Sequence, residues 1–133
     1  MSDARSTTIL IIDDTPFAAT ISDALRAADY MVTTAVSGRD ALIAIAGNCP
    51  SLILLDIDLP DVSGIDLCQI VRRHVANMPF IILITHETTA TVTAGLDAGA
   101  NDCISKSCDS RELLARVRAV LRRASAIRPS FQS

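Results

Sequence analysis

The sequence predicts an α/β fold in which one parallel sheet of five strands lies between two layers of helices. Short aliphatic and β-branched runs alternate five times with longer segments of helical periodicity. Strands that alternate with helices of about ten or more residues are typical of βαβ units, and right-handed crossovers put helices on both faces of the sheet. At 133 residues, the chain has the size of about one domain.

Five strands and five helices are predicted from these patterns. The strands are expected at residues 7–12, 30–35, 51–56, 79–85 and 102–106. The helices are expected at residues 15–29, 38–47, 64–75, 87–98 and 110–124.

Each predicted strand consists mainly of aliphatic or β-branched residues. The first, third and fourth strands contain the continuous apolar runs 9–12, 52–55 and 80–84, which are typical of buried parallel strands. The second strand is rich in β-branched residues, and the fifth is a short run through Cys103 and Ile104.

The predicted helices begin with residues that favour helix starts. Thr15 precedes Pro16, and proline is favoured at the first helical position, so Thr15 is expected to be the N-cap. Three later helices begin with motifs that resemble capping boxes, Ser37-x-x-Asp40, Ser63-x-x-Asp66 and Asp109-x-x-Glu112. The helix at 87–98 is rich in threonine, a poor helix former, and is therefore expected to be the most mobile element.

The helical pattern ends after Arg123, so residues 1–124 are expected to form the domain. Residues 125–133 have the composition of a linker or of a frayed C-terminal tail. A linker would lead into a second domain, whereas a frayed tail would fit a protein with one domain.

Composition argues against several classes of protein. A formal net charge of −3 and a sequence pI near 5.2 do not fit a domain that binds nucleic acid directly. The chain has no apolar run of membrane-spanning length, and its amino-terminal residues do not resemble a signal peptide. The four cysteines lack the spacing of a zinc site, and we expect them to be reduced thiols in a cytoplasmic protein.

Five polar residues stand where predicted strands end. Asp13 and Asp14 follow the first strand, Asp56 ends the third, and Thr85 and Lys106 end the fourth and fifth. The carboxyl ends of parallel strands lie at one edge of a sheet, where open α/β sheets bind ligands, so these side chains are expected to meet there. Lys106 is also the only lysine of the chain.

Three carboxylates, a hydroxyl and an amine suit a divalent cation together with a phosphoryl group. Carboxylates that lie close together repel one another unless a cation neutralises them, and oxygen ligands suit Mg²⁺. A carboxylate can also be the nucleophile towards phosphorus, and we expect Asp56 to have this role. Lys106 would then pair with one phosphoryl oxygen, and the Thr85 hydroxyl would donate a hydrogen bond to another.

These residues resemble the motifs of the receiver domains of two-component response regulators. Asp13-Asp14 matches the acidic pair of that family, and Asp56 matches its phosphoacceptor. Thr85 matches the switch hydroxyl of the family, and Lys106 matches its invariant lysine.

The resemblance covers about residues 7–124 and implies a flavodoxin-like fold with the strand order 2-1-3-4-5. It implies Mg²⁺-dependent phosphotransfer to Asp56 from a sensor histidine kinase or a phosphotransfer protein, with the Asp58 carbonyl as a further metal ligand. The domain would then be a phosphoacceptor and not an enzyme. Phosphorylation would switch the face around residues 85–124 and so control an output domain or an effector protein.

Similarity to receivers that dimerise implies a homodimer through residues 87–124. Arg116 or Arg118 would then pair with Asp97 or Asp102 across a two-fold axis. The alternative is that these arginines form a basic helix face that is only solvated. Exposed ion pairs are each worth only about 0–1 kcal/mol, so a dimer would also need apolar contact.

Some positions near the site differ from the family pattern. Cys103 and Cys108 stand where aromatic residues are usual, Ser107 stands where proline is usual, and His86 replaces a small residue. None of these changes removes a phosphorylation residue. The signal is expected to depend on Thr85 and on the threonine-rich helix, because the usual aromatic switch residue is lacking.

Two other interpretations remain as alternatives. The altered switch positions fit a receiver-like docking module that is not phosphorylated. Asp56-Ile57-Asp58 also resembles the nucleophile and acid/base pair of haloacid-dehalogenase-type phosphatases. In that family, however, the acidic metal ligands follow the nucleophile, whereas here the acidic pair at residues 13–14 precedes it.

Overall fold

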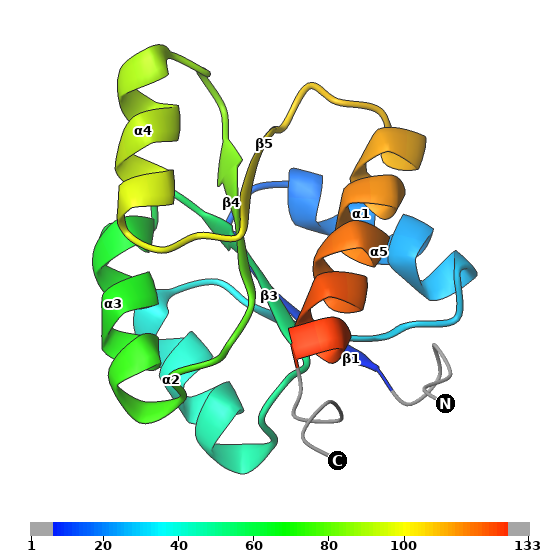
Figure 1. The fold of residues 1–133 in the computed structure, drawn as a ribbon, viewed down its shortest axis with the longest axis horizontal. Coiled ribbons are helices and arrows are strands. Elements are labelled where there is room, and N and C mark those ends of the chain that lie inside the picture. The colour runs from blue at the N-terminus through cyan, green and yellow to red at the C-terminus, as the bar shows by residue number, and fades with distance from the viewer. Residues whose placement is uncertain (1–6, 128–133) are drawn as a thin grey trace.

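The computed structural model describes residues 7–127, and a sheet of five parallel strands forms its centre (Figure 1). The strands are β1 (Thr8–Ile12), β2 (Met31–Ala35), β3 (Leu52–Asp56), β4 (Phe80–Ile84) and β5 (Asp102–Ser105). The helices are α1 (Phe17–Ala27), α2 (Gly38–Gly47), α3 (Gly64–His74), α4 (Thr89–Asp97) and α5 (Ser110–Ile127). The strand order β2-β1-β3-β4-β5 confirms the predicted flavodoxin-like topology.

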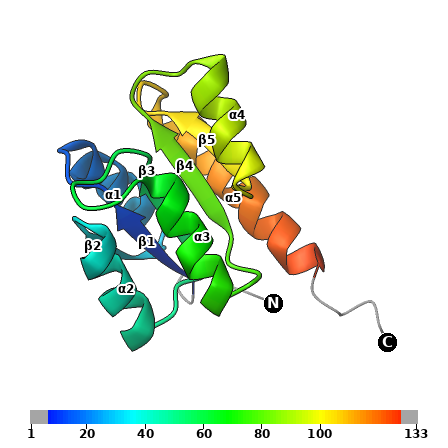
Figure 2. The same ribbon diagram turned by 90° about the vertical axis from the view of Figure 1, so that its left-hand side faces the viewer.

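The helices form two layers, one on each face of the sheet. Figures 1 and 2 show α1 and α5 together on one face, and α2, α3 and α4 on the other. The sheet and its two helical layers make the three-layer sandwich that the sequence predicts.

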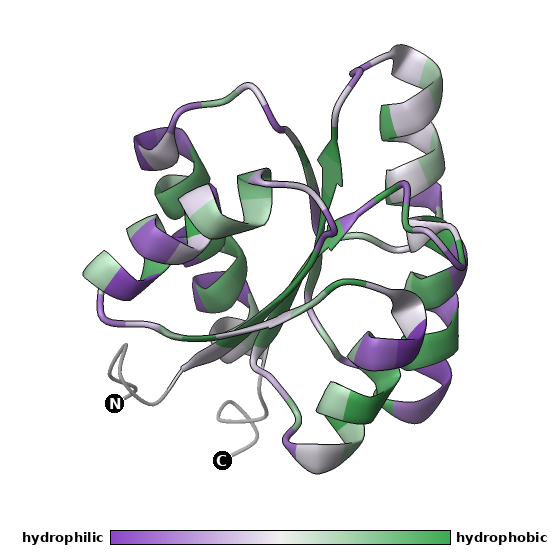
Figure 3. Cartoon of the chain, turned by 180° about the vertical axis from the view of Figure 1, so that it is seen from behind, coloured by the Kyte–Doolittle hydropathy of each residue, from purple (hydrophilic) through white to green (hydrophobic). Residues whose placement is uncertain are grey.

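Alternate residues of the strands pack on opposite faces of the sheet. In β1, Ile9 and Ile11 belong to the apolar cluster under α1 and α5, whereas Leu10 and Ile12 belong to the cluster under α2 and α3. All residues of β3 and β4 are buried, as continuous apolar runs in a parallel sheet require. Coloured by hydropathy, these central strands are apolar, and the polar residues lie mainly on the helices and loops (Figure 3).

Four helix starts carry side-chain caps. The side chains of Ser37, Ser63 and Asp109 accept hydrogen bonds from the backbone N–H groups three residues later, which is the N-cap half of the predicted capping boxes. Thr88 and Thr91 form a reciprocal capping box at the start of α4, which the sequence analysis did not predict. The predicted mobility of α4 stays a prediction.

Two predicted helix ends are wrong. Thr15 does not cap α1: its hydroxyl oxygen accepts from Lys106 Nζ, its amide and hydroxyl donate to Asp13, and the Pro16 N-cap makes no side-chain hydrogen bond. Helix α5 continues to Ile127 instead of ending at residue 124, since no glycine or proline interrupts that stretch. The rest of the predicted tail, residues 128–133, lies outside the described residues. Among the helices of the described chain, none combines the length and apolarity that crossing a bilayer requires.

Candidate functional site

The carboxyl ends of β1, β3, β4 and β5 bring the predicted polar residues to one edge of the sheet. Ile12 pairs with Leu55 across β1 and β3, so the residues that follow, Asp13 and Asp56, are neighbours. On the other side of β4, the Lys106 amide donates to the carbonyl that ends the strand, at 2.9 Å. The strand register therefore determines which side chains meet.

Asp13, Asp14 and Asp56 form an acidic cluster. One carboxylate oxygen from each residue lies within 4.8 Å of the others. Asp13 and Asp56 are buried, each with 2% of its surface exposed, while Asp14 is exposed to solvent. Two buried carboxylates this close repel one another, and a nearby cation relieves that repulsion.

Lys106 provides that positive charge. Its Nζ lies 2.9 Å from Asp13 Oδ2 and 3.0 Å from Asp56 Oδ2, and only 10% of its side chain is exposed. The same Nζ donates to Thr15 Oγ1 at 3.1 Å and lies 5.6 Å from the centroid of the Phe17 ring. The only lysine of the chain thus points into the acidic cluster, as the sequence predicts.

Burial and charge shift the protonation equilibria of this cluster. Burial raises the pKa of Asp56, although the Asp58 N–H, which donates to Asp56 Oδ1 at 3.1 Å, and the Lys106 ammonium oppose the rise. Burial alone would lower the pKa of Lys106, but the carboxylates of Asp13 and Asp56 outweigh it, and the pKa is raised. Lys106 is therefore charged at neutral pH.

The acidic cluster fits a hard metal ion. Asp13 Oδ2 is buried and receives no hydrogen bond, although it forms the ion pair with Lys106. All three candidate ligands are carboxylates, and oxygen donors of this kind prefer hard divalent cations. The cluster can therefore hold a metal ion through Asp13, Asp14 and Asp56.

Thr85 and Asp58 lie at the same sheet edge, but no hydrogen bond among the described residues joins the groups predicted to act to the cluster. Thr85 follows β4 directly and is exposed, and its hydroxyl forms no hydrogen bond with any described residue. Asp58 contacts Asp56 through its amide, and an isolated bridge to Ser63 holds its backbone. The roles predicted for the Thr85 hydroxyl and the Asp58 carbonyl stay predictions.

Two residues next to the site were not predicted as part of it. Thr15 connects Asp13 to Lys106, but its place before Pro16 had suggested a helix cap. Gly64 lies against the backbone of Asp56 so closely that a Cβ would overlap the Asp56 carbonyl oxygen. For Thr15, the available signal was its place directly after the acidic pair. For Gly64, the signal was a glycine in the loop that follows Asp56.

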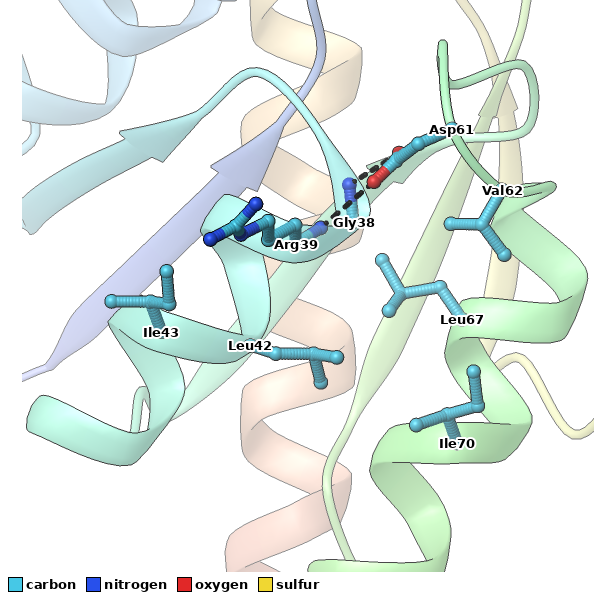
Figure 4. Close-up of a pocket in the computed structure, with 8 residues that line it drawn as sticks. All are labelled: Gly38, Arg39, Leu42, Ile43, Asp61, Val62, Leu67 and Ile70. Atoms are coloured by element: carbon cyan, nitrogen blue, oxygen red, sulfur yellow. Dashed lines mark hydrogen bonds between the residues drawn. The ribbon is translucent and has the colours of Figure 1, made fainter.

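A groove of about 480 Å³ lies between α2 and α3, away from the acidic cluster (Figure 4). Its walls include the apolar side chains of Leu42, Leu67 and Ile70. At one end, Asp61 accepts hydrogen bonds from the N–H groups of Gly38 and Arg39 at 2.8 and 3.0 Å. These two hydrogen bonds connect the loop that follows β3 to the start of α2.

The chain is similar to known regulatory proteins. It is 35% identical to the probable transcriptional regulatory protein TcrX of Mycobacterium tuberculosis over 92% of this chain and 53% of TcrX. It is 38% identical to the DNA-binding response regulator MtrA of Mycolicibacterium smegmatis over 86% of this chain and 50% of MtrA. The chain therefore spans about half the length of these curated relatives.

A solved structure and a family model agree with these relatives. The crystal structure of a putative response regulator from Chloroflexus aurantiacus superposes with a TM-score of 0.84 at 36% identity, covering 87% of this chain and 98% of that chain. The family model of the response regulator receiver domain matches residues 9–118. The chain thus belongs to the receiver domains of response regulators, the phosphoacceptors of two-component signalling.

Proposed function

We propose that Asp56 of this domain accepts a phosphoryl group from a sensor histidine kinase or a phosphotransfer protein. The observation that supports this most is the position of the Lys106 ammonium, which bridges the buried carboxylates of Asp13 and Asp56. An ammonium fixed beside the carboxylate can balance the negative charge that a phosphoryl group adds. The carbonyl and carboxylate oxygens around it suit Mg²⁺.

We propose that Asp13, Asp14, Asp56 and the Asp58 carbonyl hold Mg²⁺. When bound, Mg²⁺ would shield the negative charge on the phosphoryl oxygens during transfer. Asp13 would contribute Oδ2, since Thr15 already donates two hydrogen bonds to its Oδ1. The Asp14 carboxylate is exposed and already lies within 4.8 Å of the other two, so it can bind the ion from the solvent side.

In the transfer step, a carboxylate oxygen of Asp56 attacks the phosphorus of a phosphohistidine. The new O–P bond forms as the P–N bond breaks, and the electron pair returns to the imidazole nitrogen, which takes a proton from water. Lys106 pairs with a phosphoryl oxygen, and Thr85 moves to donate its hydroxyl proton to another. The domain is labelled once by each transfer, so we propose a stoichiometric acceptor and not a turnover enzyme.

The phosphoryl group then changes the surface around residues 85–124. Moving a population from 1:99 to 99:1 takes about 5.5 kcal/mol of differential interaction. Two new charge-assisted hydrogen bonds, from Thr85 and Lys106, contribute about 1.5–3 kcal/mol each. We therefore propose that binding of an output domain or effector completes the shift.

The names of the relatives indicate the kind of output. MtrA is called a DNA-binding response regulator and TcrX a transcriptional regulatory protein, and this chain matches about half of each. We propose that the natural protein couples this domain to a DNA-binding region. The expected absence of direct nucleic-acid contact then applies to the acidic receiver domain alone.

A homodimer through residues 87–124 would use fewer ion pairs than the sequence suggested. Arg116 already pairs within its own chain with Asp102 at 3.1 Å and with Glu112 at 3.1 Å. Arg118 and Asp97 are both exposed and remain for pairing across a two-fold axis. Nearby on α4, Leu96 is 48% exposed and could supply apolar contact.

Labelling with a small phosphodonor in Mg²⁺ tests the proposed function. Intact-protein mass spectrometry should show one added phosphoryl group on the wild type and none on Asp56→Asn. Asp66→Asn is the matched control, because Asp66 is an exposed carboxylate near the start of α3, outside the cluster. Equal labelling of Asp56→Asn and the wild type would exclude Asp56 as the acceptor. Multiple turnover of a phosphate ester would favour the phosphatase alternative, and failure of the wild type to take up phosphate or beryllium fluoride would favour the docking module.

A further inference from the structure

Beyond the residues that match the family motifs, we infer that Thr15 is a positioning residue of this site. Its hydroxyl fixes the orientation of Asp13 and holds the ammonium of Lys106. This inference rests on the proposed function, because it concerns the same cation and the same phosphoryl group.

Thr15 connects Asp13 and Lys106 through a directed set of hydrogen bonds. The Thr15 amide and hydroxyl both donate to Asp13 Oδ1, at 2.9 and 2.8 Å. Lys106 Nζ donates to Thr15 Oγ1 at 3.1 Å. A hydroxyl has one proton to donate and lone pairs that accept, so a single threonine can satisfy both groups at once.

These bonds leave one oxygen of Asp13 for a cation. Rotation of the Asp13 carboxylate would break both hydrogen bonds at Oδ1. The other oxygen, Oδ2, is buried, receives no hydrogen bond and faces the Lys106 ammonium at 2.9 Å. Thr15 therefore holds Asp13 with Oδ2, the oxygen paired with Lys106, directed into the acidic cluster.

Thr15 also gives Lys106 a partner that does not compete for the cation. The other two partners of the ammonium, Asp13 Oδ2 and Asp56 Oδ2, are candidate metal ligands. When those oxygens turn to a metal ion, the neutral hydroxyl of Thr15 can still accept from Lys106. The ammonium then stays beside Asp56, where the phosphoryl group is to be bound.

A purely structural role for the Thr15 hydroxyl is not supported. Helix α1 has no side-chain cap, so this hydroxyl does not stabilise the helix start. The side chain is exposed, and both of its hydrogen-bond partners belong to the site. Its removal should therefore change the site more than the fold.

The variants Thr15→Val and Thr15→Ser separate the hydroxyl from the shape of the side chain. Valine keeps the β-branched shape and loses the hydroxyl, whereas serine keeps the hydroxyl. Thr33→Val, on the exposed surface of β2, controls for the substitution itself. Thermal melts of all variants check folding, and a Thr15→Ala variant provides a second loss of the hydroxyl if valine perturbs the loop.

Two measurements report on the site without phosphorylation activity. Calorimetric titration gives the Mg²⁺ dissociation constant, which Thr15→Val should raise about threefold to tenfold, the worth of about one hydrogen bond. Because Lys106 is the only lysine, isotope-labelled lysine gives NMR signals from this side chain alone. Without metal, Thr15→Val should shift the Lys106 Cε signal and increase its mobility, while Thr15→Ser and Thr33→Val should match the wild type.

The two proposals can fail separately. If the wild type binds Mg²⁺ and Thr15→Val binds it equally tightly with an unchanged Lys106 signal, the role of Thr15 is refuted and the proposed function stands. Failure of Thr15→Ser to restore the wild-type values would also overturn the role of the hydroxyl. If the wild type binds no Mg²⁺ at all, the proposed function itself fails, and the positioning role fails with it.

Discussion

Replacement of Gly64 by alanine should disturb the phosphoacceptor strand through a single added methyl group. Gly64 is the first residue of α3, and its N–H donates to the Ile57 carbonyl at 2.8 Å. A Cβ at this position would overlap the Asp56 carbonyl oxygen and lie 2.8 Å from Ile57 Cα. Both neighbours are backbone atoms at the end of a buried strand, so neither can move aside as a flexible side chain could.

The size of the effect follows from this overlap. Methyl groups forced into well-packed interiors typically cost about 1–3 kcal/mol. The helix propensity that alanine gains over glycine returns at most about 1 kcal/mol. We therefore expect Gly64→Ala to lower the free energy of unfolding by about 1–2 kcal/mol. A typical domain has an unfolding free energy of only about 5–15 kcal/mol, so this loss is large. Labelling of Asp56 should fall as well, because the strand end that carries this carboxylate must shift.

Gly47→Ala is the matched control. Gly47 ends α2, and a Cβ there would meet no atom within 4 Å. This variant should be neutral or stabilised by up to about 1 kcal/mol. Urea unfolding followed by far-ultraviolet circular dichroism measures both variants, since the chain has no tryptophan. Equal unfolding free energies for Gly64→Ala and Gly47→Ala would refute the argument from close packing.

Three further variants probe the charges. Lys106→Met leaves two buried carboxylates without their ammonium, so the free energy of unfolding of the metal-free protein should fall by about 3–5 kcal/mol. Mg²⁺ should stabilise this variant more than it stabilises the wild type, as thermal melts with and without Mg²⁺ would show. Burial raises the pKa of Asp56, so the charged carboxylate destabilises the metal-free folded state. Asp56→Asn should therefore raise the free energy of unfolding at neutral pH. This gain should shrink as the pH falls through the pKa that Asp56 has in the folded protein. The N–H groups of Gly38 and Arg39 lower the pKa of Asp61, so its contribution is present above an unfolded pKa of about 4 and is lost as pH falls through the folded pKa. Urea unfolding between about pH 3 and pH 7 should thus give opposite pH trends for Asp56→Asn and Asp61→Asn, and parallel trends would contradict both assignments.

The acidic cluster was predictable because its residues end strands of one parallel sheet. Asp13, Asp56 and Lys106 are far apart in the sequence, but the carboxyl ends of neighbouring parallel strands always share an edge. Once apolar runs identify the strands, the side chain that follows each strand is placed at this edge of the sheet. The prediction needed no knowledge of how the loops fold.

Thr15 was misassigned because a distant residue, Lys106, competes with the local backbone N–H groups for its hydroxyl oxygen. Its place before Pro16 predicts a helix cap, and threonine side chains readily bond to nearby backbone N–H groups. In the structure, the Thr15 hydroxyl oxygen accepts a hydrogen bond from the Lys106 ammonium instead, while the hydroxyl donates to Asp13. Charge-assisted hydrogen bonds are about twice as strong as neutral ones, which explains why the Thr15 oxygen accepts from the ammonium and not from a backbone N–H group.

The partners of Arg116 could not be assigned from the sequence for a different reason. Glu112 lies one helical turn before Arg116, and Asp102 begins the strand that packs beside α5. Both pairs form within one chain, whereas the sequence analysis placed Asp102 across a dimer axis. A charge pattern identifies complementary residues, but it does not say whether they belong to the same molecule.

Cys103 replaces the usual aromatic switch residue, and this replacement determines how a movement of Thr85 could reach the rest of the domain. Gly95 of α4 lies so close to β5 that a Cβ there would be 2.8 Å from Cys103 Sγ, so a thiol fills the space between helix and strand. There is no ring at this position whose rotation could follow a movement of Thr85. The capping box of α4 begins at Thr88, only three residues after Thr85 in the same loop. We therefore expect an inward movement of Thr85 to act on α4 through its capped start.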